Sequence, residues 1–448
     1  TSVGGYALYA NTTASNNTAI GYSALIANTT GANNLAVGAL ALDANTTGSE
    51  NVAVGKEALT SNTTANSNTA VGFKSLFTNT TGGNNTAMGD SALRANTTAS
   101  NGTALGHSAL TANTTGTNNT AVGYQALKAN TTGASNTAIG SESLDAVTTG
   151  DANTAVGRFA GSAITTGLGN TAIGYQALDA LTTSNYNTAI GFDALSANTA
   201  ADNVAVGTNA LNACTTGTAN TGIGRSALEA STTNDHNTAI GRSAASSQTT
   251  AGNTIAIGSS AASNLTTGNN NTVVGTSAGQ AIVDSSSNVL FGYAVNTSAS
   301  GVSELVIGVQ KTGKGDGTGF IAPPGDGNLF QGNNSSSWAT TSDKRIKKNI
   351  VNNDVGLEKI NQIQVRNFKY KTSEEITELP THTAIEKEGL QLGVIAQEVE
   401  DILPDIVNTE DTGCKTVNPD NMTWYLVNAV KELSAQVDEL KNKLNEGE

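Results

Sequence analysis

A glycine recurs every 17 residues through the first 308 positions of this 448-residue chain. The repeating unit reads N-T-A-(V/I)-G-x-x-A-L-x-A-N-T-T-G-x-N, and the spacing shortens to 16 only before Gly207 and Gly308. A short period sustained over such a length is typical of a solenoid, in which each unit contacts its neighbours. The anchor glycines are Gly4, Gly21, Gly38, Gly55, Gly72, Gly89, Gly106, Gly123, Gly140, Gly157, Gly174, Gly191, Gly207, Gly224, Gly241, Gly258, Gly275, Gly292 and Gly308.

Each unit contains two short pieces that we expect to be extended, T-A-I-G and A-L-x-A, and an Asn/Thr/Gly turn. Pieces of four residues are too short for helices, and N-T-T-G is typical turn chemistry. Proline, which cannot donate to a β-ladder, is absent from residues 1–308. We therefore predict an all-β solenoid, a β-roll or β-helix, with one 17-residue coil per unit.

Three columns of the repeat are predicted to face the core. The residue before each anchor glycine is usually Val or Ile, the fourth residue after it is usually Leu, and the seventh is usually Asn. Where the fourth residue shrinks, as at Gly161, the seventh becomes Ile164, which preserves apolar volume. The Ala and Gly beside the Val/Ile column lie on the opposite pleat face, and we expect that stripe to face sister chains of a trimer.

Charge separates the chain into regions. Residues 1–308 carry only 7 basic and 14 acidic side chains, whereas residues 309–448 carry 15 and 22. We predict a repeat shaft at 1–308, a Gly/Pro-rich neck at 309–341 and a C-terminal domain at 342–448. The glycine-rich segment 313–319 lacks the strand and helix that would frame a phosphate loop, so we expect a flexible loop.

Several classes of function find no support in the composition. The net charge is −14 without a basic stripe, so we expect no nucleic-acid partner. No apolar run approaches the ~18 residues of a membrane span. Cys214 and Cys414 imply no disulfide framework. His107, His236 and His382 lack a second ligand at metal-binding spacing, so we predict no metal site and no cofactor.

The repeats resemble a known architecture. Their A-(V/I)-G-x-x-A-L units are similar to the β-roll head repeats of trimeric autotransporter adhesins and to shaft repeats of many phage fibres. The resemblance covers most of residues 1–308 and implies a trimeric β-solenoid.

Three C-terminal motifs carry a second resemblance. Residues 342–350 read S-D-K-R-I-K-K-N-I, which alone also fits a helix start. Residues 393–399 read G-V-I-A-Q-E-V and precede L-P-D-I-V, and a helix containing A-V-K-E-L ends the chain. Together they closely resemble the intramolecular chaperone auto-processing domain of phage endosialidases and related tail fibres and tailspikes. The resemblance implies a small α+β domain that trimerises, guides folding of the fibre and then cuts itself off.

By position, this resemblance implies a serine–lysine dyad. Ser342 matches the nucleophile and Lys347 the general base of a single-turnover endopeptidase, and the cleaved bond would join Thr341 and Ser342. Asp343 and Arg345 match the motif, and we expect them to shape the site. A lysine acts as a base where burial lowers its pKa, and the pair then needs no histidine. The alternative is that each of these four residues lies on the surface and forms salt bridges without a catalytic role.

The last helix is expected at about residues 419–446. Asn418 can cap it, and Pro419 suits its first turn. Six apolar residues alternate spacings of 4 and 3, which predicts a coiled-coil seam that holds the trimer: Leu426, Val430, Leu433, Val437, Leu440 and Leu444. Valine at a with leucine at d favours dimers on its own, whereas the family implies trimers, and we expect the trimer.

We therefore expect a phage tail fibre or tailspike, a structural rod of the virion that contacts the host. Its expected partners are two further copies of itself and a host-surface receptor such as a glycan, without membrane insertion. We expect no enzyme activity in the repeats, and release of the chaperone domain after assembly. The alternatives are a bacterial trimeric surface adhesin and an ice-binding solenoid, which the paired threonines suggest, although turn chemistry already explains them. The chain begins at Thr1 inside a repeat, so we expect further sequence before it.

Overall fold

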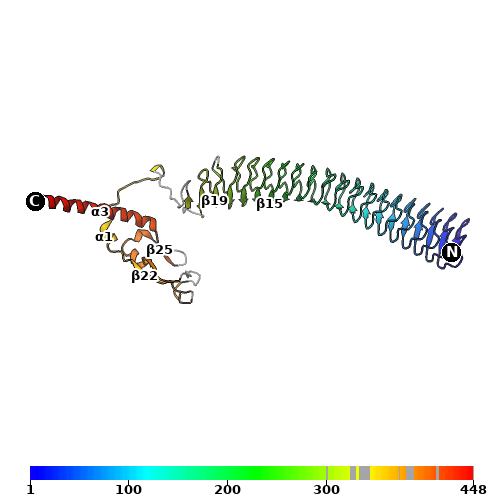
Figure 1. Ribbon diagram of the computed structural model, residues 1–448, viewed down its shortest axis with the longest axis horizontal. Helices are drawn as coiled ribbons and strands as arrows, with labels where there is room; N and C mark the ends of the chain where they lie inside the picture. The colour runs from blue at the N-terminus through cyan, green and yellow to red at the C-terminus, as the bar shows by residue number, and fades with distance from the viewer. Residues whose placement is uncertain are drawn as a thin grey trace. The chain divides into compact units, whose positions relative to one another are not determined.

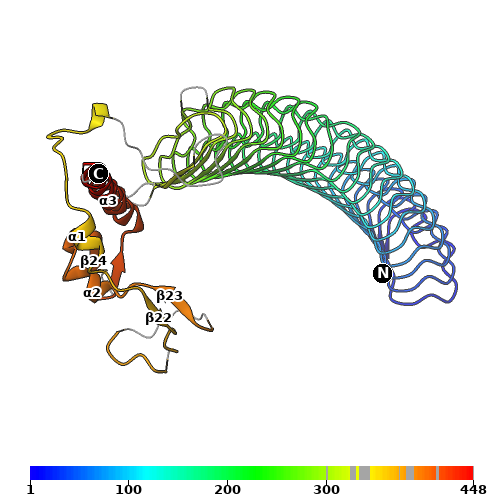
Figure 2. The ribbon, with the colours of Figure 1, turned by 60° about the vertical axis from the view of Figure 1, so that its left-hand side comes forward.

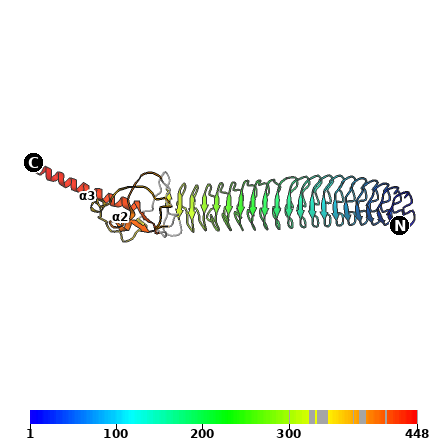
Figure 3. The same cartoon turned by 90° about the horizontal axis from the view of Figure 1, so that it is seen from below.

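The computed structural model describes residues 1–298, 301–322, 329–331, 344–372, 374–379, 388–409 and 413–446. It divides into two compact units, Thr1–Thr341 and Ser342–Glu448, which are described separately. The first unit is a parallel β-solenoid, as the repeat predicts (Figure 1). Its strands follow one another in a single row along the stack of coils (Figure 3).

Each coil contributes one short strand, and successive strands from β1 to β20 pair in parallel. The strands are β1 (Ser2–Val3), β2 (Thr18–Ile20), β3 (Leu35–Val37), β4 (Val52–Val54), β5 (Thr69–Val71), β6 (Thr86–Met88), β7 (Thr103–Leu105), β8 (Thr120–Val122), β9 (Thr137–Ile139), β10 (Thr154–Val156), β11 (Thr171–Ile173), β12 (Thr188–Ile190), β13 (Val204–Val206), β14 (Thr221–Ile223), β15 (Thr238–Ile240), β16 (Ile255–Ile257), β17 (Thr272–Val274), β18 (Val289–Phe291), β19 (Leu305–Gly308) and β20 (Gly319–Ala322). A last strand, β21 (Leu329–Gln331), pairs antiparallel with β20.

The anchor glycines are required by the stacking. From Gly4 to Gly292 they adopt φ between +124° and +141°, a region that L side chains avoid. A Cβ on Gly21 would also lie 2.5 Å from the carbonyl oxygen of Gly38 in the next coil. A side chain at this position would therefore push neighbouring coils apart.

The prediction of a second extended piece, A-L-x-A, is wrong. This piece and the residue before it form a turn in which Ser23 and Leu25 both have φ of +54°, in the left-handed region. Left-handed residues turn the backbone sharply, which lets a 17-residue coil close on itself. Hydrogen bonds between coils continue through the turn, since the Leu25 N–H donates to the Ala41 oxygen at 3.0 Å.

The predicted orientation of the strands is also wrong. Ala19 in the middle of β2 is fully buried, whereas Ile20 before the anchor glycine is 40% exposed. The column stays small where a leucine fills the coil, since a Cβ on Gly222 would lie 3.3 Å from the Leu211 side chain, whereas buried Val273 occupies the same column beside Gly279. The alanine stripe therefore lines the core of its own chain, and the Val/Ile column faces outward.

The predicted asparagine column is confirmed, and a second accompanies it. Seven residues after the anchor, the Asn28 amide donates to Asn11 Oδ1 and to the Gly31 oxygen, both at 2.9 Å. Four residues before the next anchor, the Asn34 backbone N–H donates to Asn17 Oδ1 at 2.9 Å. Asn17 Nδ2 also donates to the Gly31 oxygen, at 2.8 Å. The two ladders thus satisfy buried polar groups on either side of one turn.

Both ladders end at identifiable substitutions. Val147 interrupts the first ladder, and Asn130 Oδ1 below it is buried without a partner among the described residues. Glu304 replaces asparagine in the second ladder, and its buried carboxylate accepts the Ser298 N–H at 2.8 Å and the Gly315 N–H at 2.5 Å. The glycine-rich loop therefore packs against Glu304 and leads into β20, so the sheet continues beyond the expected end of the shaft.

The shaft also buries carboxylates near one another. Partial burial raises the pKa of Asp43, Asp145 and Asp179 above the ordinary value, and a neighbouring acid adds to the effect in each case. For Asp179 that neighbour is Asp193 in the next coil. Asp235 behaves oppositely, because hydrogen bonds from the Thr218 backbone and side chain lower its pKa.

The second unit contains short elements and one long helix (Figure 2). Two antiparallel pairs join β22 (Arg366–Phe368) to β23 (Gln391–Gly393) and β24 (Val407–Thr409) to β25 (Lys415–Val417). The helices are η1 (Lys344–Ile346), α1 (Leu357–Ile360), α2 (Ala396–Glu400), η3 (Pro404–Ile406) and α3 (Pro419–Asn445). Asn418 caps α3 as predicted, since its side chain accepts the Asp420 and Asn421 N–H groups.

We predict that Asn62→Leu lowers the free energy of unfolding of the shaft by about 2–3 kcal/mol, measured by chemical denaturation. The substitution leaves the buried Asn45 Oδ1 without its donor and removes one of the two acceptors of the Asn79 amide. Asn130→Leu is the matched control, with about half that cost, because it also removes an oxygen that already lacks a partner. Equal losses in the two variants would contradict a continuous ladder.

We predict that Asp179→Asn raises the melting temperature at pH 7 and that the gain disappears at about pH 3.5, below the ordinary aspartate pKa of ~3.9. A group with a raised folded-state pKa favours folding below its unfolded pKa, and this contribution is lost as pH rises through the folded pKa. Asp235→Asn should instead lower the melting temperature at pH 7. An Asp179→Asn profile parallel to that of the wild type would refute the assignment.

Candidate functional site

The predicted cleavage site lies only partly in the described residues. Thr341, Ser342 and Asp343 fall outside them, so the structure gives no geometry for the predicted nucleophile. The chain is described again from Lys344, where η1 begins, and the Lys347 N–H donates to the Lys344 oxygen at 3.2 Å. The side chains of Arg345 and Lys347 are exposed. The structure thus places the predicted base just after a short helical turn, on the surface of the single chain.

An extended arm, residues 348–356, leads from this turn to α1 and meets the side of α3. Asn428 Nδ2 donates to the oxygens of Asn353 and Val355, at 2.7 and 3.1 Å. Glu432 Oε2 accepts the Leu357 N–H at 3.0 Å. A Cβ on the buried Gly356 would lie 2.6 Å from the backbone nitrogen of Ala429, so the arm and the helix touch backbone to backbone.

The rest of the unit fixes the N-terminal half of α3. Tyr425 packs with Val399, Leu403 and Ile406 in a small core, and its hydroxyl donates to Asp405 at 2.5 Å. This hydrogen bond, aided by burial, raises the pKa of Tyr425. These contacts hold α3 against α2 and η3.

Two ion pairs brace the same unit. Arg366 and Glu398 pair at 3.0 Å, and Lys415 and Glu400 pair at 2.6 Å. Hydrogen bonding and charge from Glu398 raise the pKa of Arg366. Because both pairs are partly exposed, each contributes little to stability, on the order of 0–1 kcal/mol.

The six predicted seam residues lie along α3, and all of them are exposed in the single chain. Their exposed fractions run from 40% at Val437 to 78% at Leu444. Buried Tyr425 and Ala429 belong to another face of the same helix. α3 therefore packs on its own unit with one face and leaves an apolar stripe on another.

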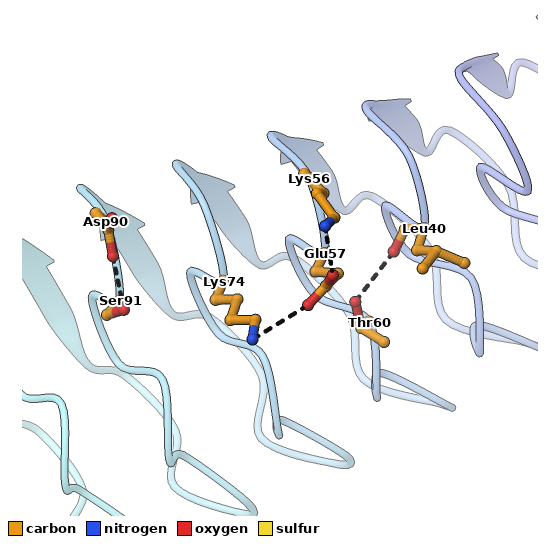
Figure 4. A network of polar contacts seen from close by, with 7 residues as sticks. All are labelled: Leu40, Lys56, Glu57, Thr60, Lys74, Asp90 and Ser91. Carbon is orange, nitrogen blue, oxygen red and sulfur yellow. Dashed lines mark hydrogen bonds and ion pairs between the residues drawn. The ribbon is translucent and has the colours of Figure 1, made fainter.

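On the surface of the shaft, charged side chains make contacts within and between coils. Glu57 accepts Lys56 of its own coil at 3.3 Å and Lys74 of the next at 3.5 Å (Figure 4). Among the described residues no group of three or more His, Cys, Asp or Glu side chains is placed to hold a metal ion. Burial raises the pKa of Cys214 to about 11, which makes this thiol a poor nucleophile.

The threonines after the asparagine column are engaged in the turn. Thr29 Oγ1 donates to the Thr46 oxygen at 3.1 Å, and Thr46 Oγ1 donates to the Thr63 oxygen at the same distance. These hydroxyls of the first threonine in each pair bond from coil to coil, whereas the second threonine, as at Thr30 and Thr47, is exposed. No helix in the described part of the chain combines the length and apolar character that crossing a bilayer demands.

Two comparisons with known proteins show what the chain is similar to. Residues 342–408 match the family model Peptidase_S74, described as the chaperone of endosialidase. The chain is also similar to the long tail fiber protein Gp37 of Enterobacteria phage K3, with 34% identity over 169 residues. That similarity covers 34% of this chain and 13% of the relative's length. With the parallel β-solenoid, these findings fit a phage tail fibre that carries a C-terminal endosialidase-type chaperone domain.

Proposed function

We propose that the chain belongs to a tail fibre of the virion whose C-terminal unit joins three copies, guides folding of the shaft and then cleaves itself off. The proposal rests on three features that begin at the same residue. The family match, the second compact unit and the S-D-K-R motif all begin at Ser342. A processing site at Thr341–Ser342 would release that unit whole.

Exposed apolar surface supports assembly of three chains. The α3 stripe of Leu426, Val430, Leu433, Val437, Leu440 and Leu444 has the 4-3 spacing of a coiled coil, and association would bury it. The shaft leaves a second stripe exposed, the Val/Ile column before the anchor glycines, as at Ile139 and Ile240. Contiguous apolar surface of this kind marks an interaction site. We assign both stripes to contacts between copies.

The repeats give a reason for a separable chaperone. Near-identical coils pair out of register at little cost, and three chains multiply the wrong pairings. A domain that joins the chains at one end sets the register before the coils pair. Its removal afterwards leaves a fibre that cannot readily retrace its assembly, so that its stability becomes kinetic.

The proposed cleavage is an acyl transfer within the chain. Lys347 accepts the hydroxyl proton of Ser342, and Ser342 Oγ attacks the carbonyl carbon of Thr341. The peptide bond breaks, its nitrogen leaves as the protonated Ser342 amine, and an ester joins Thr341 to Ser342 Oγ. Water hydrolyses the ester to a Thr341 carboxylate and a free Ser342 hydroxyl. Because Lys347 is exposed in the single chain, association must supply the burial that a lysine base needs.

Aromatic side chains on the shaft support contact with the host. Exposed rings recur one residue after several anchor glycines, and Tyr175 stacks on Phe192 of the next coil with ring centroids 5.4 Å apart. Rings offer a flat apolar face with, in tyrosine, a polar edge, which suits surface recognition. We propose that a receptor such as a glycan binds there. The exposed members are Tyr22, Phe73, Tyr124, Tyr175, Phe192 and Tyr293.

We predict that the 45.1 kDa chain splits after Thr341, as judged by intact mass. Ser342→Ala and Lys347→Ala should each slow cleavage by at least ~1,000-fold, because each removes a group that the reaction requires. Lys348→Ala is the matched control and should cleave almost normally. A new N-terminus at position 342 in the Ser342→Ala variant would refute the dyad.

We predict that Leu433→Asp combined with Leu440→Asp leaves the Ser342→Ala chain monomeric by light scattering, because two charges per copy would be buried in the seam. Lys431→Asp with Lys441→Asp, which places the same charges on exposed polar positions of α3, should still give a trimer. Trimers in the Leu433/Leu440 variant would show that the seam does not hold the copies together.

A further inference from the structure

The contact between the arm and α3 links two features that the proposed function keeps apart. The seam residues Leu426, Val430 and Leu433 span the same turns of α3 as the arm-binding residues Asn428 and Glu432. In heptad terms the arm-binding residues fall outside the a and d positions of the seam. The helix can therefore hold the arm with one face while another face meets its sister helices.

The arm is held to α3 through its backbone, and the Asn353 side chain adds a hydrogen bond to Tyr425. From Lys347 to Val355 every side chain is exposed, and Val351 is 84% exposed. Gly356 is the first residue after the predicted base that is buried. The direction in which the chain leaves α3 towards Lys347 is thus set where Asn428 and Glu432 hold it.

We propose that Gly356, Asn428 and Glu432 are positioning residues for self-cleavage. By tying the arm to α3, they convert association of the three helices into a defined placement of the segment that carries Lys347. The inference rests on the self-cleavage proposed above and adds the physical link between assembly and chemistry. Such a link makes cleavage follow assembly, so that a chain does not lose its chaperone while it is still alone.

Each residue has a distinct part in this clamp. Asn428 is the donor, and its amide bonds two successive parts of the arm. Glu432 is the acceptor and satisfies the Leu357 N–H, which lies at the first residue of α1. Gly356 provides the close approach, since any side chain there would meet the α3 backbone. A misplacement of about 1 Å at a catalytic group can slow a reaction by ~100-fold. Weakening this clamp should therefore slow the cleavage by Ser342 and Lys347.

The test is a time course of cleavage during cell-free synthesis of the full chain, with the oligomeric state of each variant measured in a Ser342→Ala background. Asn428→Asp keeps the shape of the side chain but cannot donate to the two carbonyls, and Glu432→Ala removes the acceptor. We expect both to form trimers like the wild type and to cleave ~10- to 100-fold more slowly. Glu432→Gln, which retains an acceptor oxygen, should restore most of the rate. Asn442→Asp makes the same chemical change on an exposed part of α3 and should leave the rate unchanged.

The outcomes separate this inference from the proposed function. Normal cleavage by Asn428→Asp and Glu432→Ala would overturn the inference and leave self-cleavage standing. Loss of trimers in both variants would also overturn it, because the clamp would then be needed for folding rather than for positioning. Absence of cleavage in the trimeric wild type would refute the proposed protease, and the inference with it. Amide hydrogen exchange at Leu357 gives an independent readout and should speed up in Glu432→Ala but not in Glu432→Gln.

Discussion

The close approach of backbones at the anchor glycines determines the rest of the shaft. The position that a Cβ of Gly21 would occupy lies 2.5 Å from a carbonyl oxygen of the next coil, so the coils stack only where no side chain intervenes. At that spacing the strands pair in parallel, and an asparagine in one coil reaches the asparagine of the next. The left-handed residues cost about 1–2 kcal/mol each, and they are tolerated because hydrogen bonds and buried leucines recur in every coil.

The narrowness of the core has a consequence for assembly. A typical coil encloses a leucine, an alanine and two asparagines, as Leu25, Ala19, Asn17 and Asn28 illustrate, and leaves its Val/Ile column outside. That column stands outside along the shaft, where a single chain leaves it in water. In the proposed trimer the same column joins the copies, so the feature that makes the coil small also makes the fibre depend on association.

The C-terminal unit is not stabilised by repeating coils. Its core around Val399 and Ile406 is small. The long helix α3 uses two of its faces for different contacts. One face packs on the unit and binds the arm through Asn428 and Glu432. Another carries the apolar stripe. A helix that holds both the site and the seam ties the proposed chemistry to the proposed assembly without a separate regulatory element.

The period determined the solenoid, and the capping residues and heptad pattern determined α3, because both depend on local chemistry that repeats or has a strong signature. The asparagine four residues before the anchor was also visible in most units, but its role as a second ladder went unrecognised. Sequence could not tell which pleat face is buried, because Ala19 and Ile20 are both apolar and only the packing of the closed coil decides between them. Nor could it show that the segment around A-L-x-A adopts left-handed backbone, since Ser23 and Leu25 have no such preference and the closure of the coil imposes it.

The motifs indicated Ser342 and Lys347 through resemblance, whereas the link from Gly356 to Asn428 and Glu432 joins residues more than 70 positions apart. Only the folded chain brings those residues together, because no repeat or spacing in the sequence records a contact between a backbone and a distant helix.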